Sequence, residues 1–101
     1  MTTSPAEKKH LRRIGHKLKP VVIIANKGIT EAVSAEIDRA LTDHELIKVK
    51  LATGSREIKK LLIDEICSSL KAEPVQMIGN ILLLYRVTKK PNPKLSNLLR
   101  P

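Results

Sequence analysis

A short turn leading into a helix holds the residues of this chain that are best suited to bind an anion. The turn is Ala25-Asn26-Lys27-Gly28, and Thr30-Glu31 begin the predicted helix. Gly28 can adopt a positive φ angle, and Thr30 can cap the helix with its hydroxyl oxygen. Free backbone N–H groups at a helix start attract phosphate, and Lys27 adds a cation beside them. An ordinary strand-to-helix connection has the same spacing, so the charge distribution has to separate the two interpretations.

Positive charge collects at the two ends of the chain. The net charge is +9, and residues 1–20 contain six Lys or Arg against one acid. Residues 76–101 contain five Lys or Arg and no acid, whereas the middle is nearly neutral. Basic segments on both sides of a neutral core indicate a polyanionic partner, which favours the phosphate-binding interpretation.

The first helix carries much of this charge. Ser4-Pro5-Ala6-Glu7 is a capped helix start, and Gly15 indicates where the helix ends. Leu11, Ile14 and Leu18 form a narrow apolar stripe. A charged helix face is often merely solvated, but acids normally alternate with the bases there. The candidate anion-binding residues of this segment are Lys8, Lys9, Arg12, Arg13, Lys17 and Lys19.

Four strands are predicted. Val21-Val22-Ile23-Ile24 is expected to be a strand buried on both faces, beginning at Pro20. Residues 46–52 alternate, which predicts one buried face, with Lys48 and Lys50 on the other. Residues 75–78 and 81–87 form a hairpin around Gly79-Asn80. The second hairpin strand is almost wholly apolar, so we place it inside the sheet.

Two further helices connect these strands. Thr30 caps the first of them, and Ser55 caps the other. The helix that follows Ser55 is expected to have a buried face of Ile58, Leu62 and Ile66. Leu61, Ile63 and Leu70 are expected to widen that buried face. Its start also carries the basic candidates Arg56, Lys59 and Lys60, although Glu57 permits local ion pairs there. The order helix, strand, helix, strand, helix, strand, strand predicts an α/β (α+β two-layer) fold with a mixed four-stranded sheet packed by helices.

Composition argues against several other classes. The single cysteine allows no internal disulfide, and no signal peptide or membrane-spanning run is visible, so we expect a cytoplasmic protein. The three histidines lack metal-ligand spacing, and Asp64 and Glu65 are adjacent, so neither a metal, a cofactor nor an enzyme is indicated. Tyr85 is the only aromatic residue and is expected in the core, which argues against an aromatic stacking platform.

Several stretches, taken in their order along the chain, resemble a CRM domain of the stand-alone bacterial YhbY-like type. They are HKLKPVV (16–22), GITE (28–31), HELIKVK (44–50), VQMIG (75–79) and LLYR (83–86), and together they span roughly residues 7–88. The resemblance implies a fold similar to the C-terminal domain of translation initiation factor three, with an extra N-terminal helix. It also implies binding of structured RNA, which in bacterial members is associated with large-subunit precursors.

The marker of that family is a GxxG loop, similar to the loop of KH domains, where backbone approaches RNA closely. This chain keeps the second glycine as Gly28 and has Ala25 in the first position. An alanine preserves the loop if φ is negative and strains it if φ is positive. The resemblance thus implies an RNA-binding loop of Ala25, Asn26, Lys27 and Gly28, with Thr30 beside it.

We therefore expect a monomeric RNA-binding accessory protein of large-subunit assembly. Residues 1–88 would form the RNA-binding domain, and residues 89–101 a basic, proline-containing mobile tail. One alternative is a protein–protein module that docks on acidic surfaces of the translation machinery. Membrane association through the first helix ranks last, because its apolar stripe is narrow and has no aromatic residue.

Overall fold

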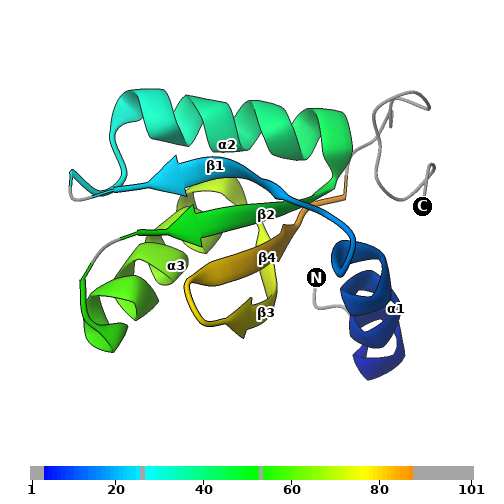
Figure 1. The fold of residues 1–101 in the computed structure, drawn as a ribbon. Coiled ribbons are helices and arrows are strands. Elements are labelled where there is room, and N and C mark those ends of the chain that lie inside the picture. Colours follow the sequence, from blue (N-terminus) through cyan, green and yellow to red (C-terminus); the bar gives the residue numbers. More distant parts are fainter. Residues whose placement is uncertain (1–3, 26, 53, 88–101) are drawn as a thin grey trace.

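The computed structural model describes residues 4–25, 27–52 and 54–87, so the expectations for Asn26 and for the tail at 89–101 lie outside the described residues. The elements follow the predicted order (Figure 1). They are α1 (Pro5–Gly15), β1 (Pro20–Ile24), α2 (Glu31–His44), β2 (Leu46–Leu51), α3 (Arg56–Leu70), β3 (Glu73–Ile78) and β4 (Ile81–Tyr85).

Each helix begins directly after the residue predicted to cap it. Ser4 and Glu7 form a capping box at α1. The hydroxyl oxygens of Thr30 and Ser55 accept the N–H groups of Val33 and Ile58 at the starts of α2 and α3. These bonds satisfy backbone donors that lack partners in the first turn of a helix.

The sheet is mixed and four-stranded, as predicted, with the order β1-β2-β4-β3. β1 and β2 are parallel, and the pairs β2–β4 and β3–β4 are antiparallel. β4 therefore lies inside the sheet, as expected. β3 begins at Glu73, earlier than the predicted 75, and includes Pro74 because an edge strand tolerates a missing N–H.

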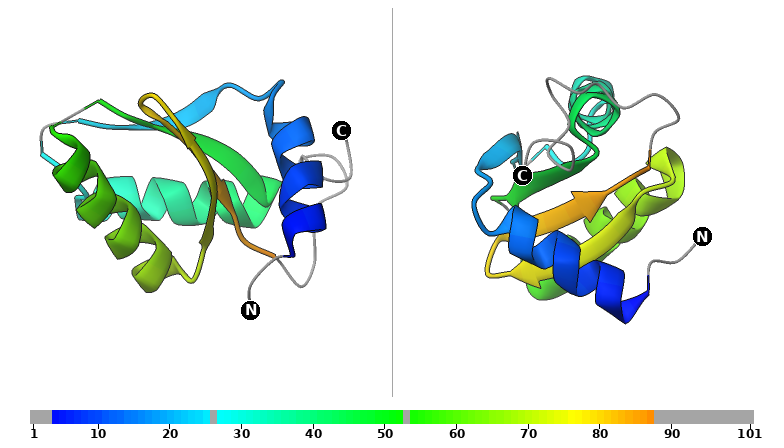
Figure 2. Two further views of the ribbon diagram at one scale, coloured as in Figure 1. Left: turned by 90° about the horizontal axis from the view of Figure 1, so that it is seen from below. Right: turned by 90° about the vertical axis from the view of Figure 1, so that its right-hand side faces the viewer.

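Helices cover the two faces of the sheet unequally. α2 and α3 pack on one face, around buried residues that include Ile24, Val49 and Leu82. α1 packs on the opposite face at one end, where Leu11 contacts a cluster with Leu46, Val75 and Leu83. Figure 2 shows α1 on the other side of the sheet from α2 and α3. Much of this second face is left uncovered.

Two burial predictions are wrong. β1 is not buried on both faces, because Val21 and Ile23 are 49% and 59% exposed while Val22 and Ile24 are buried. The reason is that β1 is an edge strand and α1 covers only the far end of that face. In α3, Ile58 and Leu61 are 47% and 67% exposed. The helix buries a narrower stripe than predicted, centred on Ile66.

Candidate nucleic-acid interface

The turn after β1 is closed by its own backbone. The N–H of Gly28 donates to the carbonyl oxygen of Ala25 at 2.9 Å, and Gly28 has φ +71°. Among the described residues other than glycine, positive φ angles occur at Glu45 and Lys71, so Ala25 does not need one. Alanine therefore replaces the first glycine of the GxxG pattern without backbone strain.

Lys27 and Thr30 have different roles in this loop. The Lys27 side chain is exposed, which suits it to contact a charged partner. The hydroxyl oxygen of Thr30 accepts the N–H of Val33 at 3.1 Å, so its capping bond already explains this residue. Gly28 lies near α3, because a Cβ added there would be 3.8 Å from Leu62 Cδ2.

Three connections share one end of the sheet. The strands β1 and β2 are parallel, so both of their helix-leading turns lie at the same edge. β4 is antiparallel to β2, so the β3–β4 turn also lies there, and the Leu51 N–H donates to the Asn80 carbonyl at 2.7 Å. The fold thus places Lys27 at the same end of the sheet as the start of α3.

The basic residues of α3 line a depression beside the β3–β4 turn. It has a volume of about 560 Å³ and includes Arg56, Lys59 and Lys60 together with Asn80. Lys59 Nζ donates to Asn80 Oδ1, which ties α3 to the turn. Arg56 and Lys60 are exposed, so these two cations are better placed than Lys59 to meet a partner.

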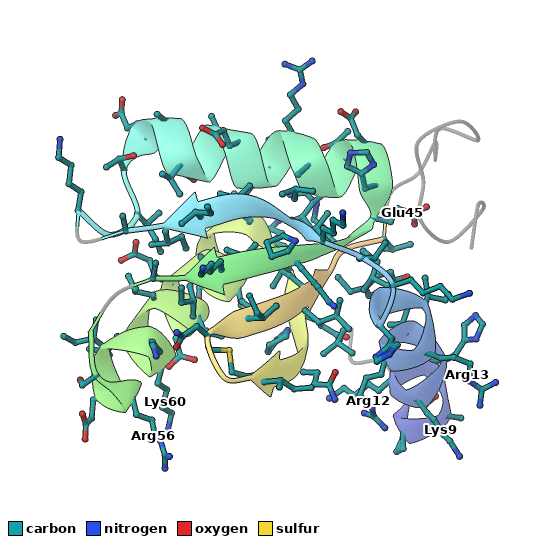
Figure 3. All side chains as sticks on the ribbon, in the orientation of Figure 1. Lys9, Arg12, Arg13, Glu45, Arg56 and Lys60 are labelled. Carbon is teal, nitrogen blue, oxygen red and sulfur yellow. The ribbon has the colours of Figure 1, made fainter. Side chains whose placement is uncertain are left out.

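The basic helix α1 lies at the opposite end of the sheet from these residues. Figure 3 shows Arg12 on the side of α1 that faces the sheet and Arg13 on the outer side. Lys9 lies closer to the N-terminal end of the helix. A depression of about 470 Å³ between α1 and β3 brings several of the candidates together. Its lining includes Lys9, Arg12, Arg13, His16, Lys17 and Gln76. Lys8 and Lys19 do not line it, although Lys19 is exposed.

A deeper cavity of about 160 Å³ shows what the sequence analysis missed. It joins Arg12 and His16 of α1 to Lys48 of β2 and Gln76 of β3. The alternation in residues 46–52 placed Lys48 on the polar face of its strand, but it did not indicate that α1 docks beside it. None of the residues that line this cavity or the depression beside it is acidic.

The acids that do approach this face gather elsewhere, around Tyr85. Partial burial raises the pKa of Tyr85, and the nearby carboxylates of Glu45, Glu7 and Glu73 raise it further. Tyr85 is partly buried and packs against the Leu11 cluster, so the structure agrees only in part with its expected place in the core. Negative charge around this phenol makes it a poor site for a polyanion.

The ion pairs found in the described part of the chain do not involve the basic residues of α1. Arg86 pairs with Asp38 at 2.7 Å, and Arg39 pairs with Asp43 at 3.8 Å. Residues 4–25, 27–52 and 54–87 contain no group of His, Cys, Asp and Glu side chains that could hold a metal ion. Within the same residues, no helix is long and apolar enough to cross a bilayer.

Residues 4–86 match the CRS1 / YhbY (CRM) domain. A protein of Pseudomonas aeruginosa named a probable RNA-binding protein is 50% identical over 100 residues, covering 99% of this chain and 96% of the relative. An RNA-binding protein of Haemophilus influenzae is 48% identical, covering 88% of this chain and 90% of the relative. The solution structure of a hypothetical protein from Staphylococcus aureus has a TM-score of 0.77 at 31% identity, covering 88% of this chain and 93% of that one.

Proposed function

The chain belongs to the CRS1 / YhbY (CRM) domain family, and on that basis we propose that it is an RNA-binding accessory protein. Relatives at 50% and 48% identity are named for RNA binding, which supports the same activity here. The observation that carries the proposal is the acid-free groove between α1 and the sheet, where Arg12, His16 and Lys48 meet. Clustered cations without interspersed acids match a phosphate backbone.

We further propose that the RNA is ribosomal and belongs to precursors of the large subunit. The support for this step is the resemblance to stand-alone bacterial YhbY-like proteins. The loop at Lys27 and Gly28 would contact phosphates through its backbone and its cation, and α1 would widen the basic surface. Exposed Arg56 and Lys60 lie at the loop end of the sheet and would extend the contact there.

The test is RNA binding by a variant that loses one cation from each end of the surface. We expect Arg12→Gln, Lys27→Gln to bind a large-subunit RNA fragment about tenfold or more weakly. The slope of log affinity against log salt should fall by about 2, because two phosphate contacts are lost. The matched control is Arg39→Gln, Lys71→Gln, which removes the same charge from exposed positions on α2 and after α3. Equal losses in both variants would mean that net charge alone drives binding.

Ribonuclease treatment distinguishes RNA binding from the alternative suggested by the sequence, a protein–protein module. Under the RNA proposal, association of the tagged protein with large-subunit particles is lost when the RNA is digested under conditions that leave ribosomal proteins intact. Association that persists after digestion would favour docking on a protein surface.

A further inference from the structure

We infer that the uncovered face of the sheet is a seat for an unpaired segment of RNA, with bases on an isoleucine row and phosphates on Lys48 and Lys50. This inference rests on the proposed RNA binding and specifies which form of RNA the site takes. It assigns a role to a surface that lies between the two groups of cations described above.

The row follows from the strand register. Ile23 pairs with Lys50, Lys50 with Ile81, and Ile81 with Ile78, so these residues cross β1, β2, β4 and β3 in one line. Their side chains share the face opposite α2 and α3, because Ile24, Leu51 and Leu82, the next residues along their strands, belong to the core on the other face. With strands about 4.8 Å apart, the row is about 14 Å long.

The row is open to solvent. Ile23 and Ile78 are 59% and 64% exposed, Lys50 is exposed, and Ile81 is partly buried. α1 borders the row without covering it. Leu11 of α1 packs on Leu46, Val75 and Leu83, whereas Arg12 and His16 share a cavity with Ile78 and Ile81. Single exposed apolar side chains are ordinary, but aligned ones on one sheet face indicate a binding surface.

Charge selects the occupant of this face. Lys50 interrupts the isoleucines, and Lys48 lies two residues back on the same face of β2. Lys48 also lines the cavity with Arg12 and His16, so cations border the row on the side of α1. A partner that combines apolar surfaces with regularly spaced negative charge fits this pattern, and single-stranded RNA has both features.

The apolar row also argues for unpaired rather than duplex RNA. In a duplex the base faces are stacked on one another and cannot contact a protein surface, whereas unpaired bases can be splayed onto a sheet. The length of the row suits about two or three bases, the number that other RNA-binding sheets accommodate. Aliphatic contacts replace aromatic stacking here, because the one aromatic residue, Tyr85, packs in the Leu11 cluster.

Methyl NMR of the full chain tests the inference directly. With isoleucine δ1-methyls labelled, titration with a single-stranded ten-nucleotide RNA should shift Ile23, Ile78 and Ile81 and give intermolecular contacts to base protons. Ile37 of α2 is the control, because it is buried in the core on the other side of the sheet. Binding that shifts Ile37 equally, or leaves the three row methyls unchanged, overturns the inference while RNA binding itself stands. The face would then be available to a protein partner.

Affinity measurements separate this inference from the proposed function. We expect Ile23→Thr, Lys50→Gln to bind the single-stranded RNA about tenfold more weakly, and a duplex of the same sequence nearly as well as wild type, because neither residue lines the groove of Arg12, His16 and Lys48. The charge-matched control Arg39→Gln should bind both RNAs like wild type. An equal loss of affinity for the single-stranded RNA and the duplex would overturn only the inference that the site takes an unpaired segment. Failure of the wild-type protein to bind the single-stranded RNA while it binds a large-subunit RNA fragment overturns this inference alone, and failure to bind any of the three RNAs overturns both proposals.

Discussion

Gly15, the last residue of α1, lies against the side chain of Leu83 in β4. A Cβ placed on Gly15 would be 2.7 Å from both δ carbons of Leu83, and Leu83 is buried. This close approach brings the basic helix onto the sheet beside Lys48. The groove between α1 and the sheet therefore depends on the missing side chain at Gly15.

The first prediction is that Gly15→Ala destabilises the domain. Overpacking against Leu83 should lower the free energy of unfolding by about 1–3 kcal/mol, partly offset by the better helix propensity of alanine. Urea unfolding measures the change. Adding Leu83→Ala makes room for the methyl group, so the double variant should lose less stability than the sum of the two single variants. Strict additivity would contradict the close contact.

A second prediction concerns Arg86, the residue that directly follows β4. Its side chain links the C-terminal half of α2 to the end of α3. Its guanidinium donates to Asp38 Oδ1 at 2.7 Å, to the Leu70 carbonyl at 3.1 Å and to Thr42 Oγ1 at 2.9 Å. We expect Arg86→Ala to cost about 2–3 kcal/mol of unfolding free energy, measured by urea denaturation, because several charged hydrogen bonds are lost together.

Arg86→Lys should recover only part of that stability, because an ammonium group cannot reproduce the guanidinium fork. The control is Arg39→Ala, which removes an exposed ion pair of 3.8 Å. Its effect should stay below about 1 kcal/mol. Similar losses for Arg39→Ala and Arg86→Ala would contradict a specific clamp.

The third prediction separates the two ends of the turn. Gly28→Ala should cost about 1–2 kcal/mol, because φ is +71° there and the nearest side chain, at 3.8 Å, leaves room for the methyl group. Ala25→Gly should change the unfolding free energy by less than about 1 kcal/mol, since Ala25 has no positive φ. Thermal unfolding of both variants checks the contrast, and a larger loss for Ala25→Gly would reverse our assignment of the strained position.

The fourth prediction is a pH dependence at Cys67. Partial burial raises the pKa of its thiol from 9.0 to about 11, with smaller contributions from Asp64 and Glu73. Because the thiolate is the nucleophile, iodoacetamide should react with the native protein along a pH curve centred near 11. In urea-unfolded protein the midpoint should return to about 9.

The raised pKa of Cys67 also predicts how the stability of the protein changes with pH. Above pH 9 the unfolded chain releases this proton before the folded chain does, so stability should fall as the pH rises from 9 to about 11. Cys67→Ala should remove that component of the slope. An unchanged slope in Cys67→Ala would assign the alkaline loss to other groups.

Much of the fold could be predicted because its signals are local. The capping residues Ser4, Thr30 and Ser55 act within three residues along the chain, and Gly79-Asn80 reverses the chain by turn geometry alone. The prediction of Ile23 as buried failed for a different reason. An apolar residue in a strand does not indicate whether another element will cover it, and α1 packs at the far end of that face.

The sequence by itself determined the element order, the caps, the turn at Gly28 and the excess of cations, because each depends on residue type and short-range spacing. Only the tertiary structure decided that Lys48 joins Arg12 in one cavity and that Ile23, Lys50, Ile81 and Ile78 form one row. Those neighbours come from separate strands and from α1. Their meeting depends on register and on the docking of α1 at Gly15, which are set by packing between segments distant in the chain.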